Sequence, residues 1–128
     1  MKYLLDTHTL LWITRDDEQL SPVVREIYLD HHQDVFISMA SLWEMSIKIS
    51  LNKLNIHMPL ADFIKFHIRG NQIRILDIKL PHIEQIEILP FHHRDPFDRL
   101  IVTQAMVENM PVLSRDRHFD LYPVKRIW

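Results

Sequence analysis

Short apolar runs rich in β-branched and aromatic residues alternate along this chain with longer stretches of helical periodicity. Tyr3–Leu5 is the first such run, and a stretch of helical length follows it. Ser21 and Asp95 each precede a proline, the pattern of an N-cap followed by proline at the first helical position. The predicted order is strand 3–5, helix 7–13, helix from 22 to about 31, strand 35–37, helix 40–51, helix 60–68 stopped by Gly70, strand 73–76, helix 80–89, helix 96–108, strand 111–113, a helical turn through 119 and strand 124–127.

Strands that alternate with helices predict an α/β fold, in which helices cover both faces of a mostly parallel sheet of four to five strands. The 128 residues, 47% of them apolar, suit a single domain over residues 1–128. No apolar run approaches the roughly 20 residues that span a bilayer, and Asp6 comes too early for a signal peptide. The chain has no cysteine, which removes disulfides and thiol nucleophiles and suits a reducing compartment. We therefore expect a cytoplasmic protein.

Four acidic residues occupy positions where a carboxylate is unfavourable unless a positive group meets it. Asp6 and Asp116 each follow an apolar run, at the carboxyl end of a predicted parallel strand, which is where open α/β sheets bind ligands. Taken singly, an aspartate there is more often a turn former or an N-cap. The other two, Glu44 and Asp98, fall on apolar helix faces, within about 60° of their apolar neighbours at about 100° per residue. Those neighbours are Ala40, Ile47 and Leu51 for Glu44, and Ile101, Val102 and Ala105 for Asp98.

Two simpler interpretations remain open for the helical acids. Glu44 could form an i,i+4 pair with Lys48 at the margin of the apolar stripe, worth a few tenths of a kcal/mol. Asp98 could share a capping role with Asp95, although Asp95 is the better candidate for the cap.

A cluster of carboxylates is tolerated mainly when a divalent cation shares its charge, because the acids otherwise raise one another's pKa. Hard oxygen ligands suit Mg²⁺, and Mn²⁺ as well. Mg²⁺ keeps open coordination positions that accept phosphate oxygens, so the pattern predicts a metal-dependent hydrolase that acts on phosphodiesters.

The other charged and aromatic residues add less. A formal net charge of −2 argues against binding nucleic acid by bulk positive charge but allows a local basic rim, with solvated surface arginines as the alternative. We expect the histidines, including His8, His92 and His93, to pack on the surface or in loops rather than to bind zinc or act as a general base, since no His-Glu-x-x-His spacing occurs. We expect the aromatic residues at helical positions, Trp12, Trp43 and Phe97, in the core or in dimer contacts. The expected basic rim consists of Arg94, Arg99, Arg115 and Arg117.

Four short motifs together resemble the PIN-domain nucleases, specifically the VapC-type toxins. They are Leu4-Leu5-Asp6-Thr7-His8, Ser41-Leu42-Trp43-Glu44, His93-Arg94-Asp95-Pro96-Phe97-Asp98-Arg99-Leu100 and Ser114-Arg115-Asp116. The resemblance covers nearly the whole chain and implies a three-layer α/β/α fold and a Mg²⁺- or Mn²⁺-dependent endoribonuclease. It also implies an antitoxin partner, a homodimer, and a basic rim that guides RNA.

By this resemblance, the acidic quartet of the family falls on the four acids singled out above. Asp6 and Asp98 are expected as direct metal ligands, and Asp116 completes the metal set. Glu44 and Asp116 are expected to act through water or a second ion. Thr7 and Ser114 match positions that hold an acid or a phosphate in place, with turn and cap hydroxyls as the alternative. The further acid of the third motif, Asp95, leaves the assignment within that motif open.

Two other classes remain as alternatives. An aspartyl-phosphate protein of the haloacid or receiver type also places an aspartate after the first strand, but His8 stands where the former needs an acid and Ser114-Arg115 where the latter needs a lysine. A non-catalytic module could use an acidic cleft to receive the arginines of a partner.

Overall fold

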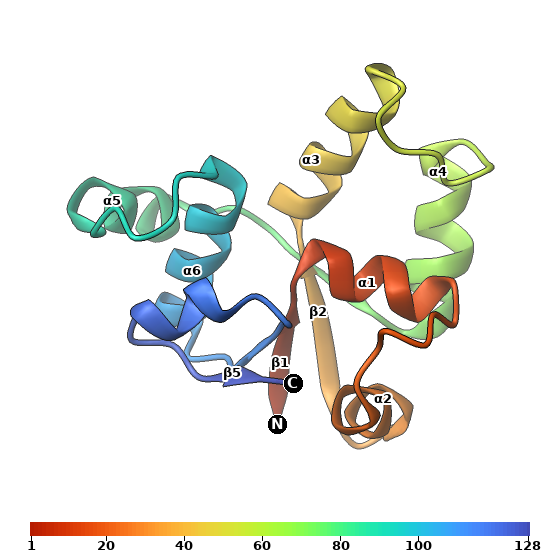
Figure 1. Ribbon diagram of the computed structural model, residues 1–128, viewed down its shortest axis with the longest axis horizontal. Helices are drawn as coiled ribbons and strands as arrows, with labels where there is room; N and C mark the ends of the chain where they lie inside the picture. Colours follow the sequence, from red (N-terminus) through yellow and green to blue (C-terminus); the bar gives the residue numbers. More distant parts are fainter.

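A five-stranded parallel sheet runs through the centre of the computed structural model, which describes residues 1–128 (Figure 1). Every strand pairing is parallel, so the expected sheet is confirmed. The central strand β1 lies between β2 and β4, with Leu4 opposite Phe36 on one side and Val112 on the other. The strand order is β3-β2-β1-β4-β5, with β1 Lys2–Leu5, β2 Asp34–Ser38, β3 Arg74–Leu76, β4 Val112–Leu113 and β5 Arg126–Ile127.

Helices cover both faces of this sheet, which gives the three-layer α/β/α arrangement (Figure 1). The longest helix has 13 residues, and no helix is long and apolar enough to cross a membrane. The helices are α1 Thr7–Thr14, α2 Pro22–Leu29, α3 Met39–Ser50, α4 Leu60–Phe63, α5 Leu80–Ile88 and α6 Pro96–Glu108, and a 3₁₀ segment, η3, spans Arg117–Leu121.

Alternation along β1 supplies two separate hydrophobic cores, because successive side chains of a strand point to opposite faces. Tyr3 and Leu5 belong to the core shared with α1 to α4, whereas Leu4 belongs to the core shared with α6 and η3. Leu4 and Leu5 are both fully buried. Both faces of β1 are therefore apolar, and the first polar residue after the strand is Asp6 at its carboxyl end.

The helix starts that the sequence predicts are confirmed. Ser21 Oγ accepts the Val24 N–H at 3.1 Å, and Asp95 Oδ1 accepts the Phe97 N–H at 2.8 Å. Ser38 caps α3 in the same way through the Ala40 N–H. Each cap satisfies a donor that the first turn leaves open and stabilises its helix by about 1 kcal/mol.

The segment 60–72 differs from the single helix that the sequence predicts. Helix α4 gives way to a π-helical turn, Ile64–Ile68, and then to a 3₁₀ turn, Arg69–Asn71. Gly70 is not the left-handed stop of this helix; Gln72 takes that conformation, with φ of 61°. A Cβ atom at Gly70 would lie 3.3 Å from the Lys65 carbonyl oxygen, so close backbone approach is what favours glycine there.

Candidate metal centre

Asp6 links the carboxyl end of β1 to the start of α1. Its Oδ1 accepts the Thr7 N–H at 2.8 Å, and its Oδ2 accepts the Ser114 hydroxyl at 2.8 Å. The residue is only 6% exposed. Burial raises the pKa of Asp6, with a contribution from the charge of Asp116, and the two hydrogen bonds oppose that shift only in part. Asp6 is thus a buried acid whose hydrogen bonds both come from uncharged groups.

Glu44 is equally buried, on α3, but it has a cationic partner. Its Oε2 lies 3.0 Å from Lys48 Nζ, so the i,i+4 pair is present. Its Oε1 lies 3.0 Å from Thr7 Oγ1, and the Thr7 hydroxyl must donate this hydrogen bond because a carboxylate only accepts. Thr7 Oγ1 then accepts a second hydrogen bond from the Ser41 hydroxyl, 2.8 Å away. Ile47 and Leu51 are exposed, so the apolar stripe expected around Glu44 is wrong in its second half. Glu44 thus has Lys48 on one carboxylate oxygen and the Thr7 hydroxyl of α1 on the other.

Asp95 and Asp98 have different places at the start of α6. Asp95 is the N-cap, as expected, and its Oδ1 also lies 3.4 Å from the Asp98 N–H. Asp98 points inward, with 17% of its side chain exposed. Burial raises its pKa to about 8, helped by the charges of Asp6, Asp95, Glu44 and Asp116. Asp98 is therefore a buried acid whose pKa is raised further by the other acids of the cluster.

Asp116 follows β4 and caps η3. Its Oδ1 accepts the His118 N–H at 2.9 Å and lies 2.8 Å from His118 Nδ1. The backbone N–H of Asp116 donates to the Ser114 hydroxyl at 3.0 Å. Burial acts to raise the pKa of Asp116, but hydrogen bonds from His118 and His93 together hold it below its usual value. Asp116 thus ionises more readily than Asp6 and Asp98, whose pKa values are raised.

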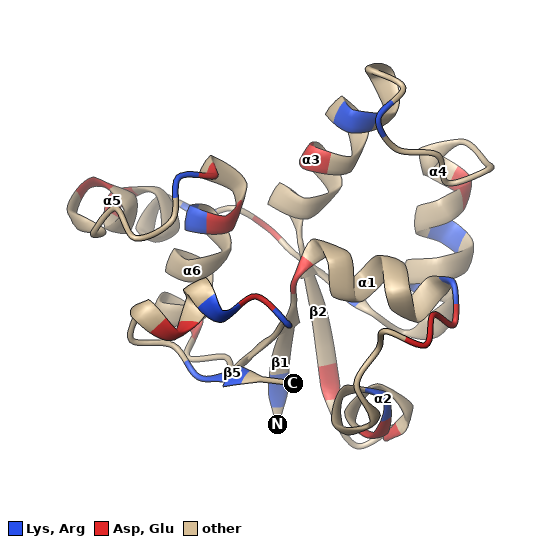
Figure 2. Ribbon diagram, viewed as in Figure 1, with Lys and Arg blue, Asp and Glu red and all other residues tan.

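The structure brings all four predicted acids together at the carboxyl edge of the sheet. Acidic segments lie between β1 and α1, on α3 and at the start of α6 (Figure 2). The two predicted hydroxyl residues connect them, since Thr7 contacts Glu44 and Ser114 contacts Asp6. A cavity of about 350 Å³ opens beside the cluster, lined by Asp6, His8, Trp12, Arg115 and Asp116.

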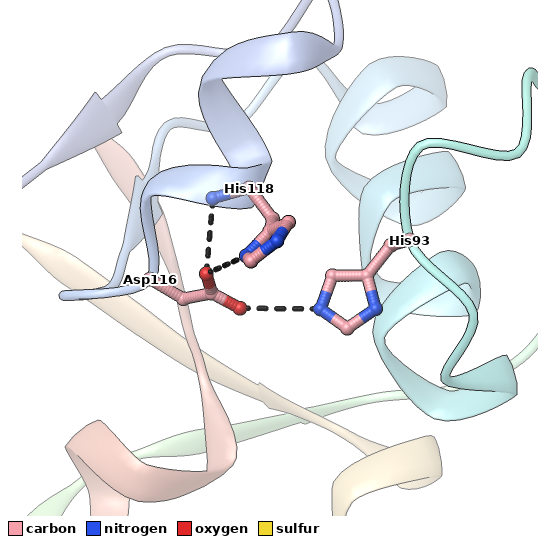
Figure 3. Close-up of side chains that lie close together, drawn as sticks. All are labelled: His93, Asp116 and His118. Carbon is pink, nitrogen blue, oxygen red and sulfur yellow. Dashed lines mark hydrogen bonds and ion pairs between the residues drawn. The ribbon is translucent and has the colours of Figure 1, made fainter.

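One residue of the cluster, His93, was not predicted from the sequence. His93 Nε2 lies 3.1 Å from Asp116 Oδ2 (Figure 3). It also lies 3.1 Å from Asp98 Oδ2. The expected packing is found for His92, whose ring packs against Tyr122 at 5.1 Å, and for His93, whose ring packs against His118 at 5.3 Å. For His93 the prediction missed the contacts with two acids. The only available signal was the position of His93 shortly before the cap of a helix that carries an acid.

Three of the four arginines expected in the basic rim are exposed, and the fourth is buried. Arg94, Arg115 and Arg117 are exposed. Arg99 is 4% exposed and donates to the carbonyl oxygens of Pro90 and Leu89, at 3.0 and 3.2 Å. Arg99 therefore holds the loop before α6 and does not belong to an RNA-binding rim.

Nearly the whole chain matches one protein family. The model of the PIN domain matches residues 3–125. The chain belongs to the PIN-domain family. No curated protein matches the sequence. The match is to neither of the aspartyl-phosphate classes that the sequence left open.

Solved structures share the fold of this PIN domain. VapBC2 from Rickettsia felis, bound to a DNA fragment from its promoter, has a TM-score of 0.74 at 15% identity, over 99% of this chain and 98% of that one. DNA-bound VapBC from Salmonella typhimurium has a TM-score of 0.71 at 18% identity, over 99% and 97%. A toxin-antitoxin complex from Klebsiella pneumoniae has a TM-score of 0.61 at 14% identity, over 98% and 96%. At these identities the likeness concerns the fold.

The donor set of this PIN domain fits a hard divalent cation. All four predicted acids offer carboxylate oxygens, which suit Mg²⁺ and Mn²⁺. Lys48 pairs with Glu44, whereas the Asp6 carboxylate is hydrogen-bonded only by uncharged groups. The raised pKa of Asp98 has like charges among its causes, which a bound cation would offset.

Cation binding to this PIN domain is expected to strengthen as the pH rises from 6 to 8. Asp98 must ionise to bind a cation, and its pKa of about 8 in the metal-free chain makes that deprotonation costly at neutral pH. Affinity for Mn²⁺ should rise by up to about tenfold per pH unit, with release of a proton on binding. Calorimetric titration at pH 6, 7 and 8, in two buffers of different ionisation enthalpy, measures both quantities. Constant affinity without proton release would contradict the expectation.

Proposed function

We propose that this PIN domain is a metal-dependent endoribonuclease and the toxin of a toxin-antitoxin pair, similar to VapC-type toxins. The observation that carries the proposal is the meeting of four carboxylates at the carboxyl edge of the sheet, where their mutual repulsion helps raise the pKa of Asp98 to about 8. Such an arrangement is costly in a chain that does not bind a cation. The match to the PIN family and the fold shared with VapBC structures support the same conclusion.

The contacts of each acid suggest its role. Asp6 and Asp98 would ligate Mg²⁺ or Mn²⁺ directly, because both face the cluster without a lysine or arginine partner. Asp116, whose pKa is lowered, would complete the set, and Glu44 would act through water because Lys48 and Thr7 already engage its oxygens. The cation would orient a water molecule for in-line attack on the phosphodiester and offset the charge of the leaving oxygen.

Exposed groups around the cluster suit the proposed partners. Arg94, Arg115 and Arg117 would attract RNA phosphates that the carboxylates alone would repel. Trp43 is 57% exposed and packs edge-on against Phe97 at 5.1 Å, which makes this pair a candidate surface for a homodimer. An antitoxin is the proposed protein partner, by analogy with the toxin-antitoxin complex of similar fold. A cytoplasmic location accords with an RNA substrate.

The purified protein is expected to cut a total-RNA pool into discrete fragments with Mg²⁺ or Mn²⁺, and to leave the same pool intact with EDTA. RNA sequence choice depends on loop shape and base contacts, so only some RNAs of the pool should be cut. Gel analysis of the pool, beside a single-stranded DNA of mixed sequence, measures metal dependence and substrate class together. Binding of Mn²⁺ without cleavage of any RNA would instead favour the non-catalytic acidic module.

A further inference from the structure

The loop that connects α5 to α6 is fixed by two buried side chains from elsewhere in the chain. The Tyr122 hydroxyl accepts the His93 N–H at 2.8 Å and donates to the Pro90 carbonyl oxygen at 2.9 Å. Arg99 donates to the same carbonyl and lies over the ring of Phe91 at 3.9 Å. Tyr122 and Arg99 are each 4% exposed. The position of His93 is therefore set by packed, hydrogen-bonded groups.

The tautomer of His93 follows from its three polar neighbours. The Asp95 N–H points at His93 Nδ1 across 3.2 Å, and since an amide N–H can only donate, Nδ1 carries the lone pair. The proton of the neutral ring is then on Nε2, which lies 3.1 Å from both Asp98 Oδ2 and Asp116 Oδ2. Figure 3 shows the ring directed at the Asp116 carboxylate. His93 thus donates a hydrogen bond to Asp116, and the same Nε2–H group lies within ion-pair distance of Asp98.

The same tautomer argues against His93 as a metal ligand. Ligand atoms of His93, Asp116 and His118 lie within 4.8 Å of one another, a grouping that resembles a metal site with two imidazoles (Figure 3). Ligation through Nε2 would need the lone pair there and would move the ring proton to Nδ1, where it would face the Asp95 N–H. The two imidazoles instead surround Asp116, which accepts from both.

We propose that His93 is a positioning residue of the metal centre, whose Nε2–H group binds Asp116 and keeps it next to Asp98 for a shared divalent cation. The inference rests on the proposed function in that it treats these two aspartates as metal-binding groups. Asp98 comes from α6 and Asp116 from the segment after β4, and the Nε2–H group of His93 contacts both carboxylates. Hydrogen-bonded partners of metal ligands typically contribute 10- to 100-fold to metal affinity.

Replacement of His93 tests this role. His93→Phe keeps an aromatic ring but removes the donor, and should weaken Mn²⁺ binding about tenfold. His93→Gln places an amide N–H near the position of Nε2 and should restore most of the affinity. His92→Phe is the matched control, because this neighbour packs on Tyr122 and contacts no acid; its Mn²⁺ affinity should equal that of the unchanged protein. Calorimetric titration of the full chain with Mn²⁺, in the absence of RNA, gives all four affinities.

Three results would overturn the inference. The first is equal Mn²⁺ affinity for His93→Phe and the unchanged protein. The second is a visible Co²⁺ spectrum typical of nitrogen ligation that His93→Phe abolishes, because His93 would then be a ligand. The third is a His93→Phe variant that binds Mn²⁺ normally but has lost RNA cleavage at saturating Mn²⁺, which would make His93 a catalytic residue. Failure of the unchanged protein to bind Mn²⁺ would overturn the proposed function as well, so the two failures are distinguishable.

Discussion

Asp6→Asn is expected to lower metal-dependent RNA cleavage by at least about 100-fold, since a metal ion supplies several kcal/mol of transition-state stabilisation. The fold should survive, because the new amide oxygen still accepts the Thr7 N–H as N-cap and the new amide nitrogen can donate to Ser114 Oγ. Loss of charge at this proposed metal ligand should therefore appear as lost cleavage without lost structure. Initial rates on one RNA fragment that the unchanged protein cuts, at several Mn²⁺ concentrations, give the effect.

A suitable control for this variant lies far from the cluster. Asp62 is an exposed aspartate in the first turn of α4, so Asp62→Asn makes the same chemical change without touching the acids. Its cleavage rate should match that of the unchanged protein. If Asp6→Asn, correctly folded, cuts RNA as fast as Asp62→Asn, the proposed metal centre is wrong or the activity belongs to a contaminant.

Asp98→Asn is expected to stabilise the metal-free chain at pH 8 by about 3 kcal/mol, a value reduced from the full pKa difference because the site can relax. The folded chain holds the pKa of Asp98 at about 8, against 3.8 for an unperturbed aspartate. At any pH between these two pKa values, the folded chain binds more protons at Asp98 than the unfolded chain does. Its free energy of unfolding therefore falls as the pH rises through this window, and an uncharged amide avoids the loss.

Urea unfolding in EDTA at pH 5 and pH 8 measures this effect. The stability difference between Asp98→Asn and the unchanged protein should be smaller at pH 5 than at pH 8. Asp62→Asn should stay within about 0.5 kcal/mol of the unchanged protein at both values, as exposed substitutions usually do. A destabilised Asp98→Asn at pH 8 would show that the carboxylate is not strained in the metal-free fold. Added Mn²⁺ should stabilise the unchanged protein more than the variant.

Local patterns predicted most of the fold. The N-caps Ser21, Ser38 and Asp95 and the apolar runs of the strands depend on neighbours within a few residues, so the sequence contains their signals directly. The segment after α4 was predicted less well, because a π-helical turn has no distinct periodicity and because Gly70 serves close packing instead of a left-handed stop. The four acids were predicted as a group because strand ends and helix faces constrain where their side chains lie.

Residues whose direction depends on distant segments were predicted poorly. Arg99 follows Asp98 by one residue and points to a different face of α6, where it meets carbonyl groups of a loop whose path no local pattern describes. His93 lies on that loop, and its backbone is fixed by Tyr122, 29 residues later in the chain. Glu44 is buried and accepts a hydrogen bond from Thr7 of α1, although half of its predicted apolar stripe is exposed. In each case the tertiary contact, and not the local pattern, decides the role.

The order of the strands has a consequence for synthesis of the protein. β1 begins at Lys2, but one of its two neighbours in the sheet is β4, which begins at Val112 and precedes Ser114 and Asp116. A nascent chain still attached to the ribosome carries Asp6 long before the segment that completes its surroundings exists. The proposed nuclease would therefore become active only after the segment that carries Ser114 and Asp116 has been synthesised and β4 has paired with β1.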